Sequence, residues 1–528
     1  MQLNDYISSG KAVLGIEFGS TRIKAVLIGP DYAPIASGDY VWHDTLEGSV
    51  WTYSLDDVWK GLQTTYANLK NDVKEKFGVV PTSFASIGIS AMMHGYIPFD
   101  ADDNQLVSFR TWRNTITGPA SEELTSVLDF NIPQRWTVSH LYQAILNGEE
   151  HLAKLSKVNT LAGYVHRKLT GENVVGVGEA SGMFPIDSTT GLFNTAMVEK
   201  FEALMASKGY SFRIADIFPG VLSAGQPAGN LTAEGALLLD PSGDLQPGVP
   251  FCPPEGDAGT GMTATNSITV RTGNVSAGTS IFSMVVLEKP LSKVHPELDI
   301  VTTPVGKDVA MVHCNTCTSD LDQWVALFAD LLASAGFEYS KNDLYTLLFN
   351  TALKGDPDCG TLTTFNYYSG EPVTGTDSGV PVFMRTPDSP LNLANFMRAV
   401  INSTFSTLKV GMDILDEENV KIDSLLGHGG LFKTKQVGQQ LLSAALNVPV
   451  SVMTTAGEGG PWGMALLAAY MVDADGDTLE SFLANKVFAS SEVYTVAPDA
   501  KDVEGFKSFI ARYKKALPAE VAAAAALY

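Results

Sequence analysis

The sequence predicts an α/β protein built from two domains. Its 528 residues exceed what one ordinary hydrophobic core accommodates, and 45% of them are hydrophobic. Short strand-like runs alternate with segments of helical period along the chain. A strand, glycine turn and strand near residue 19 is also echoed about 260 residues later. We therefore expect one domain over residues 1–267 and a second over residues 268–528.

The acidic net charge of the chain argues against two classes of binding partner, nucleic acids and anionic membranes. The chain carries 35 Lys and Arg against 58 Asp and Glu, a net charge of -23. Nucleic acid and anionic membrane surfaces repel such a protein, so neither is expected as a partner. The stretch "MQLNDYISSGK" has no basic region followed by an apolar run, and no run of 18 uncharged apolar residues occurs. These features predict a cytoplasmic protein without a membrane span.

The cysteines predict no disulfide framework. Four occur in the whole chain: Cys252, Cys314, Cys317 and Cys359. Cys314 and Cys317 form a CxxC pair, which is typical of redox sites and of half a zinc site. No second CxxC or histidine pair completes a tetrahedral zinc site. Reduced structural thiols are the simpler interpretation.

The first half of the chain reads as strands, a long helix and a strand that leads to a polar turn. Residues 12–41 are strand-like runs broken by Gly and Pro. Apolar residues three or four apart predict a helix over 55–77. "FASIGIS" (84–90) is a buried strand whose carboxyl end delivers "AMMHG" (91–95), the place where open α/β sheets bind ligands. Residues 140–170 are expected to be helical, and 237–262 to be a loop rich in Pro and Gly.

The second half repeats the plan. "NVSAGTSIFSMVVLE" (274–288) reads as strand, Gly-Thr-Ser turn and strand, and it aligns Gly278 with Gly19. Helices are expected at 320–335 and 391–415. Residues 425–453 then read as strand, glycine turn, helix and strand. "EGGPWGMALLAAY" (458–470) is a glycine-rich entry into an apolar helix.

The glycine turns indicate a nucleotide. They lie at Gly19, Gly278, Gly427–Gly430 and Gly457–Gly460, each between a strand-like run and another element. Glycine lets the backbone approach a ligand, and successive N–H groups in such a turn bind anions. One such turn is usually structural, whereas four in one chain favour phosphate binding. No Walker A pattern and no GxGxxG after a strand occurs, so neither a P-loop nor a dinucleotide fold is expected.

A series of motifs runs in order along nearly the whole length of the chain: "GIEFGSTRIKAVL", "IGISAMMHGYIPFD", "KLTGE", "ASGMFPID", "PEGDAGTGM", "NVSAGTS", "TTFNYYSGEP", "LGHGGLFKTKQVGQQLLSAALNVPV" and "EGGPWGMALLAAY". In these segments the chain resembles the FGGY family of carbohydrate kinases. The "MHG" in the second segment is the version found in xylulokinases. The resemblance implies two actin-like, ribonuclease H-like domains flanking a catalytic cleft, with ATP and Mg²⁺ as cofactors.

The resemblance also implies roles for individual residues. Asp257 is the catalytic base and a metal ligand together with Glu17, while Met93 and His94 contact the sugar. Lys24 is either a phosphate contact or a solvated strand-edge lysine. The residues expected to bind ATP are Gly19, Ser20, Thr21, Lys24, Gly278, Thr279, Ser280, Gly429, Gly430 and Lys433. Trp112, Arg113 and Asn114 of "TWRN" are expected to contact the sugar by stacking and hydrogen bonds.

Departures from the family pattern point to a divergent branch. Glu17 stands where the family mostly has aspartate, and "TWRN" takes the place of WNDxR. "PQRWTVSHLYQ" (133–143) lacks the usual lysine, and Asn402 replaces an acidic residue or glutamine.

The sequence thus predicts ATP-dependent phosphorylation of a sugar hydroxyl. D-xylulose, a ketopentose, is the first candidate, and L-ribulose or another ketose or polyol is the alternative. A non-catalytic sugar-binding regulator or ATPase on the same fold is the alternative from another class, although no basic helix-turn-helix pattern precedes residue 11. The expected partners are a sugar and ATP. The oligomeric state is left open, with a homodimer as one alternative.

Overall fold

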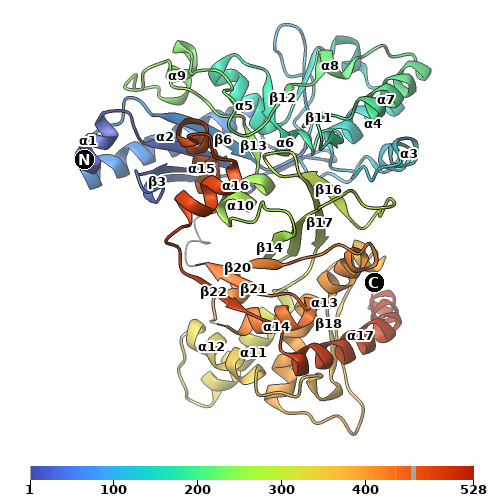
Figure 1. Ribbon diagram of the computed structural model, residues 1–528. Helices are drawn as coiled ribbons and strands as arrows, with labels where there is room; N and C mark the ends of the chain where they lie inside the picture. The colour runs from blue at the N-terminus through green and yellow to red at the C-terminus, as the bar shows by residue number, and fades with distance from the viewer. Residues whose placement is uncertain (1, 435, 454–458, 528) are drawn as a thin grey trace. The chain divides into compact units, whose positions relative to one another are not determined.

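The computed structural model describes residues 2–434, 436–453 and 459–527. The chain forms two compact units: unit 1 is Met1–Ile268, Asp299–Val309 and Glu458–Ser490, and unit 2 is Thr269–Leu298, Ala310–Gly457 and Ser491–Tyr528. Each unit has a mixed β-sheet with helices packed on it, which confirms the predicted α/β class (Figure 1). The division at residues 267 and 268 stays a prediction.

The sheet of unit 1 has five strands in the order β13-β6-β1-β2-β3. Their bounds are Glu255–Gly256, Ser86–Ala91, Val13–Phe18, Arg22–Ile28 and Pro34–Val41. The hairpin β1–β2 and the pair β2–β3 are antiparallel, while β1, β6 and β13 are parallel. The predicted strand at 84–90 is thus confirmed as β6, and the carboxyl ends of three strands share one edge.

Glycines let two helices approach opposite faces of this sheet. A Cβ on Gly15 of β1 would lie 2.2 Å from the carbonyl oxygen of Pro461 in α15 (Gly459–Asp473). A Cβ on Gly38 of β3 would lie 2.3 Å from the carbonyl oxygen of Thr65 in α2 (Leu55–Phe77). Gly38 pairs with Ala25, and Ala25 pairs with Ile16, so these three residues face the same side of the sheet. Gly15 precedes Ile16 in β1 and therefore faces the opposite side, because successive residues of a strand alternate between the two faces. The predicted helix at 55–77 is confirmed.

The helix expected over 140–170 is wrong as one element. The structure has α4 (Thr137–Asn147), a 3-10 turn (Glu150–Lys154), strand β8 (Lys157–Asn159) and α5 (Leu161–Thr170). Gly148 caps α4 with φ of 63°, a left-handed conformation that ends a helix, and Gly171 caps α5 in the same way. A glycine stop signal inside the expected helix was therefore overlooked.

Unit 1 also contains shorter elements around the sheet. They are α1 (Leu3–Ser8), β4 (Thr45–Glu47), β5 (Val50–Thr52), β7 (Ile97–Phe99), α3 (Gly118–Leu128), β9 (Val174–Gly176), α6 (Val177–Ala180), β10 (Ile186–Asp187), β11 (Leu192–Phe193), α7 (Thr195–Ser207), α8 (Ile214–Ile217), β12 (Gly220–Leu222), α9 (Ala233–Leu239), α10 (Asp257–Ala264), β16 (Asp299–Thr302) and α16 (Leu479–Phe482).

Unit 2 repeats the strand plan of unit 1. Its sheet runs β17-β15-β14-β20-β21-β22, with bounds Asp308–Cys314, Ile281–Val286, Thr272–Ala277, Ser424–Gly429, Val450–Met453 and Val493–Val496. The hairpin β14–β15 is antiparallel and β14–β20 is parallel, as are β1–β2 and β1–β6 in unit 1. The echo between Gly19 and Gly278 therefore marks equivalent hairpins.

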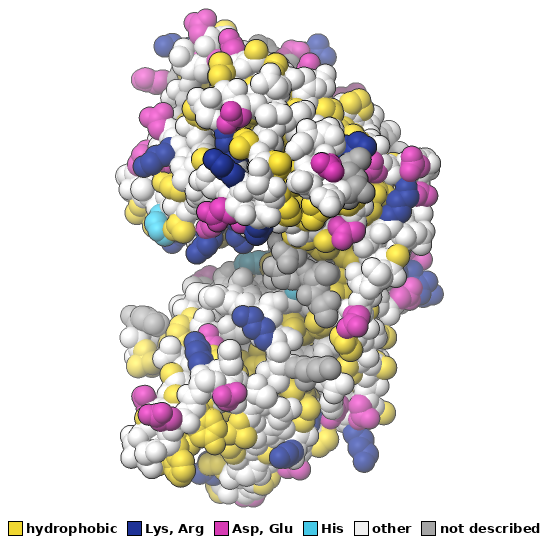
Figure 2. Space-filling model, turned by 90° about the vertical axis from the view of Figure 1, so that its left-hand side faces the viewer, with side chains coloured by type: hydrophobic (Ala, Val, Ile, Leu, Met, Phe, Trp, Pro, Cys, Tyr) yellow, Lys and Arg dark blue, Asp and Glu magenta, His cyan; other side chains and the backbone are white. Residues whose placement is uncertain are grey.

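In unit 2, the helices α11 (Ser319–Ser334), α13 (Leu393–Glu417) and α14 (Val437–Leu446) lie in segments that were predicted to be helical. The unit also contains the helices α12 (Lys341–Ala352) and α17 (Ala500–Leu527) and the strands β18 (Thr363–Asn366) and β19 (Pro381–Met384). On the face drawn in Figure 2, acidic and basic side chains are interspersed. Within the described ranges, no helix combines the length and apolar character that a membrane span requires.

Candidate active site

Three strand ends bring the sequence-predicted residues of unit 1 to one edge of its sheet. Phe18 at the end of β1 pairs with Ala91 at the end of β6, and Gly256 at the end of β13 pairs with the same alanine. The next residues are Gly19 after β1, Met92 after β6 and Asp257 after β13. Three predicted parts of the site therefore start side by side: the phosphate turn at Gly19, the sugar segment that carries Met93 and His94, and the catalytic Asp257.

The turn after β1 is held by aromatic side chains. Gly19 donates its N–H to the carbonyl of Arg22 at 2.9 Å, which closes the hairpin. The Trp42 indole donates to the Gly19 carbonyl, and the Tyr53 hydroxyl donates to the Ser20 carbonyl, both at 2.7 Å. Ser20 is half-buried and Thr21 is exposed. With these carbonyls occupied, the turn is fixed, and the side chain of Thr21 is exposed.

Glu17 lies on the sheet face that α15 covers. It pairs with Lys24 on β2 and with Ser90 on β6. Glu17 is two residues after Gly15 in β1 and so faces the same side of the sheet as Gly15, which contacts α15. A Cβ on Gly460 would lie 2.2 Å from Oε1 of Glu17. Burial and the nearby charge of Asp257 raise the pKa of Glu17 to about 7, and Lys24 opposes this shift. The two carboxylates thus repel each other, as expected of side chains that share a cation.

Asp257 is the first residue of α10, so the expectation that it lies in a loop is wrong. Gly256 caps the helix in an extended conformation, and small residues follow. The helix packs closely on α15, where a Cβ on Gly463 would lie 2.0 Å from the Thr260 carbonyl. Burial raises the pKa of Asp257 although solvent reaches its side chain, while the N–H of Met93, which donates to Oδ1 at 3.2 Å, opposes the rise.

The side chain of His94, within the predicted sugar segment, is held by its neighbours. The residue has a left-handed backbone with φ of 70°, and its side chain is buried. Its Nδ1 lies 3.2 Å from the carbonyl of Gly182, and its ring stacks with Trp136 at 6.3 Å between centroids. Burial and the charge of Arg135 hold the pKa of His94 below its usual range. A neutral imidazole that donates from Nδ1 keeps Nε2 as an acceptor for a hydroxyl.

The three residues of "TWRN" already have partners within unit 1. The Trp112 indole donates to Ser20 Oγ at 3.3 Å and stays partly exposed. Arg113 pairs with Asp44 at 2.7 Å and stacks 3.6 Å over the ring of Trp51. Asn114 is buried and bonds the backbone of Trp51 in both directions. That these three residues contact the sugar stays a prediction. The hydrogen bonds of Asn114 to the backbone of Trp51 indicate that this residue also has a structural role.

Sequence reasoning missed two features near Asp257. The buried Glu255 accepts N–H bonds from Gly178 at 3.2 Å and Glu179 at 2.9 Å, so it ties the strand before Asp257 to α6. Arg135 forms an ion pair with Asp299 at the start of β16. The position of Glu255 two residues before Asp257 in the sequence was an available signal, whereas nothing local links Arg135 to Asp299.

The ATP-binding residues expected in unit 2 also meet at strand ends. Ala277 at the end of β14 pairs with Gly429 at the end of β20. Gly429 has φ of 101°, and a Cβ there would lie 2.4 Å from the Ala277 carbonyl, so glycine is required. Gly278 follows directly, with Thr279 exposed and Ser280 half-buried, and Gly430 and Lys433 are exposed. Of the fourth glycine turn, Gly457 lies outside the described residues.

The CxxC pair supports one of these turns. Cys317 donates its N–H to the Thr279 carbonyl at 2.8 Å, and Thr318 donates to the Gly278 carbonyl at 3.1 Å. Both cysteines are buried free thiols, and burial raises their pKa values, so they resist ionisation. Among the residues that the structure describes, no group of three or more His, Cys, Asp or Glu is placed to hold a metal ion.

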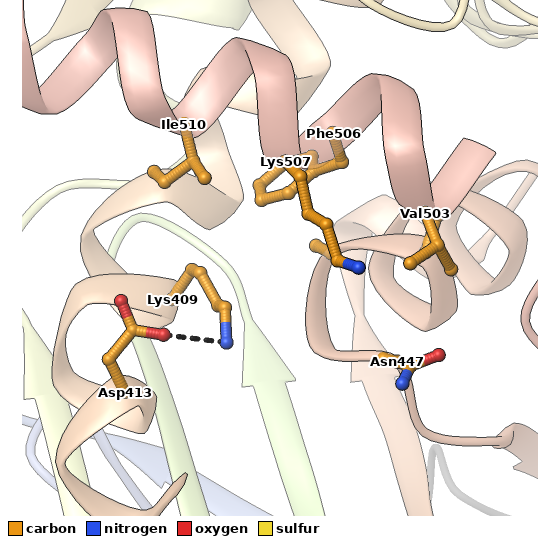
Figure 3. Close-up of a pocket in the computed structure, with 9 residues that line it drawn as sticks. Lys409, Asp413, Asn447, Val503, Phe506, Lys507 and Ile510 are labelled. Atoms are coloured by element: carbon orange, nitrogen blue, oxygen red, sulfur yellow. Dashed lines mark ion pairs between the residues drawn. The ribbon is translucent and has the colours of Figure 1, made fainter. Parts of the chain in front are cut away.

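A pocket of about 250 Å³ lies elsewhere in unit 2, between α13, α14 and α17 (Figure 3). Val503, Phe506 and Ile510 line it, and Lys409 pairs with Asp413 at 2.7 Å on one side. None of the residues predicted to bind ATP or sugar lines this pocket.

Comparisons with known proteins agree with the geometry. The model of the N-terminal domain of the FGGY family of carbohydrate kinases matches residues 12–259, and the model of its C-terminal domain matches residues 273–472. The xylulose kinase of Haemophilus influenzae is 22% identical over 515 residues, which cover 95% of this chain and 98% of that protein.

Solved structures share the fold at low sequence identity. The structure of a xyloylose kinase from Brucella ovis superposes with a TM-score of 0.77 at 19% identity, covering 96% of this chain and 99% of that one. A gluconate kinase from Lactobacillus acidophilus gives 0.78 at 16% identity, covering 98% and 100%. The predicted two-domain fold is therefore confirmed. With both family models matched in order along the chain, this protein belongs to the FGGY family of carbohydrate kinases.

Proposed function

We propose that this carbohydrate kinase transfers the γ-phosphoryl group of ATP to a hydroxyl of a ketopentose, with D-xylulose as the first substrate to test. The observation that carries the proposal is the shared edge of β1, β6 and β13, where Asp257 lies beside Met93 after β13, and the Gly19 turn follows β1 on the other side of β6. The name of the Haemophilus influenzae relative favours D-xylulose over other ketoses.

In this proposal, each group of predicted site residues has a separate role in binding or catalysis. Asp257 accepts the proton of the attacking sugar hydroxyl, and His94 accepts a hydrogen bond that orients the sugar. Ser20, Thr21 and the turn N–H groups hold phosphate oxygens, as do Thr279 and Ser280 of unit 2. Gly429, Gly430 and Lys433 border the adenosine. These groups supply positioning and charge, which is most of what phosphoryl transfer requires.

A magnesium ion fits the carboxylates present. The charge of Asp257 raises the proton affinity of the buried Glu17, and a divalent cation relieves that repulsion. Two side-chain oxygens leave room for water and phosphate oxygens, the arrangement that Mg²⁺ prefers in kinases. When bound, the ion neutralises phosphate charge. We therefore propose Glu17 and Asp257 as its protein ligands.

The decisive test is Asp257→Asn in an ADP-release assay with ketopentoses, polyols and glycerol. The variant is expected to bind sugar normally while kcat falls roughly 10²- to 10⁴-fold, the usual contribution of a general base. Asp216→Asn is the matched control, because Asp216 is exposed in α8 of the same unit. Near-normal turnover by the Asp257 variant removes this residue from the role. ADP release that ignores every sugar favours an ATPase instead.

A further inference from the structure

Arg135 is held beside the proposed sugar segment by its own backbone and by its neighbour. Its carbonyl accepts the N–H of Gly95 at 3.4 Å. The next residue, Trp136, is fully buried and stacks on His94 with ring planes 17° apart. Thr137 then donates its hydroxyl to the Gly95 carbonyl at 2.7 Å. The guanidinium of Arg135 therefore starts from a backbone locked onto the turn that carries His94.

The partner of Arg135 comes from a distant part of the chain but is anchored to the same place. Asp299 pairs with the guanidinium, and the Asn131 amide donates to its Oδ1 at 3.4 Å. Its strand is fixed three residues later, where Thr302 donates to Ser181 Oγ and to the Val177 carbonyl, both at 3.0 Å. Ser181 directly precedes the glycine whose carbonyl faces His94.

The ion pair is firm yet accessible. The Arg135 side chain is 26% exposed and that of Asp299 is 13% exposed. A guanidinium and a carboxylate side by side offer N–H donors and oxygen acceptors to the same ligand. A polyhydroxyl compound uses both, because each sugar hydroxyl donates one hydrogen bond and accepts others.

The pair also sets the charge of the site. Arg135 favours the ionised form of Asp257 and disfavours protonation of His94, so its charge reaches both groups. Asp299 offsets part of that positive charge, and His94 is neutral. Glu17 and Asp257 add negative charge to this edge in their ionised forms. A substrate that carries its own carboxylate meets like charge there, whereas a neutral sugar does not.

We propose that the Arg135–Asp299 pair is the specificity-determining element that binds the hydroxyls of a neutral sugar and rejects sugar acids. The inference rests on the proposed kinase function and narrows its substrate class. Asp299 is the part that rejects acids, because without it the Arg135 guanidinium loses its carboxylate partner and can bind a substrate carboxylate in a bidentate way. The pair thus sets the preference between two substrate classes, and a single substitution shifts that preference toward sugar acids.

The test compares kcat/KM for D-xylulose and D-gluconate in the wild type, Asp299→Asn and the double variant Arg135→Gln/Asp299→Asn. The wild type is expected to favour the neutral sugar by about 100-fold or more. Asp299→Asn should lower efficiency with D-xylulose and raise the gluconate-to-xylulose ratio by about tenfold or more. The double variant should lose that gain, because the free cation is gone.

Asp103→Asn is the matched control, since it removes the partner of another arginine of unit 1, Arg167, at 2.5 Å. It should leave the ratio unchanged. A wild type that accepts both sugars equally, or a folded Asp299→Asn enzyme with the wild-type ratio, overturns the inference while leaving the kinase function intact.

The same variants keep the inference testable if the proposed function fails. Should the wild type phosphorylate neither sugar, equilibrium binding of D-xylulose and D-gluconate by calorimetry replaces turnover. Asp299→Asn must then shift the affinity ratio toward D-gluconate by about tenfold. Binding of neither sugar, or an unchanged ratio, overturns the inference.

Discussion

The N–H of Met93 donates a hydrogen bond to Oδ1 of Asp257 at 3.2 Å, across the end of the parallel strands β6 and β13. The proposed sugar segment thereby positions the proposed base. The room for this contact comes from Gly256, because a Cβ there would lie 2.1 Å from Met93 Cγ and 2.6 Å from Glu179 Oε2. The site thus depends on a glycine that itself has no chemical role.

Gly256→Ala is expected to lower kcat/KM by about 100-fold, because a 1 Å displacement of reacting groups costs that much. The backbone of Gly256 is extended and suits alanine, so the loss comes from the clash and not from the conformation. Steady-state kinetics with the preferred sugar measures the effect.

Gly261→Ala is the matched control, because Gly261 lies in the helix that Gly256 caps and nothing lies within 4 Å of its added Cβ. Activity should stay within about twofold of wild type, and stability should rise by up to about 1 kcal/mol. An active Gly256→Ala enzyme would show that the Met93–Asp257 contact does not limit catalysis.

Activity is predicted to depend on the length of the Glu17 side chain, because its carboxylate occupies the space beside Gly460. Gly460→Ala should abolish most activity, since its Cβ would lie 2.2 Å from Glu17 Oε1. Glu17→Asp is expected to retain activity with an altered Mg²⁺ requirement, while Glu17→Gln loses most of it because the carboxylate charge is removed. The measurement is kcat against Mg²⁺ concentration.

The double variant Glu17→Asp/Gly460→Ala makes the test specific. The shorter carboxylate leaves space for the methyl group, so activity should exceed that of Gly460→Ala alone. Strict additivity of the two losses would mean that the residues do not interact. Normal turnover by Glu17→Gln would exclude the carboxylate from the metal site.

Local sequence patterns predict many of the candidate site residues, but few of the packing contacts and ion pairs that hold those residues in place. The turns at Gly19 and Gly278 and the strand end before Met93 follow from glycine spacing and strand patterns, and these signals are local. The helix starting at Asp257 was missed because glycines at 259 and 261 read as a loop, whereas packing against α15 stabilises a helix there. The Arg135–Asp299 pair arises only when distant segments fold together, so no periodicity reveals it.

Glu255 is predicted to be a structural tie whose loss lowers stability. It accepts the N–H groups of Gly178 and Glu179, and its side chain fills the space where Cβ atoms of Gly176 and Gly178 would lie. Glu255→Gln replaces one acceptor oxygen by a donor, so one buried N–H loses its partner. The free energy of unfolding should fall by about 1–3 kcal/mol, measured by urea denaturation.

Glu122→Gln is the control for that change, because Glu122 is exposed on α3 of the same unit. Its effect should stay within about 0.5 kcal/mol. An unaltered denaturation midpoint for Glu255→Gln would show that the two N–H bonds add nothing to stability.

His166 is predicted to make the protein less stable as the pH falls. It is fully buried, its Nε2 donates to the Ala228 carbonyl at 2.9 Å, and its Nδ1 has no partner among the described residues. Burial lowers its pKa from 6.5 to about 4. The unfolded chain therefore binds a proton between pH 6.5 and pH 4 that the folded protein refuses, and stability falls through that window.

At pH 5 this single residue should cost about 2 kcal/mol of the free energy of unfolding relative to pH 7. His166→Gln keeps a donor for the Ala228 carbonyl but does not titrate, so its stability should depend less on pH over the same window. Thermal or urea unfolding at pH 5, 6 and 7 measures the difference between the slopes. Parallel curves for variant and wild type would mean that His166 accepts a proton in the folded protein, and that its environment is more polar than the unpartnered Nδ1 implies.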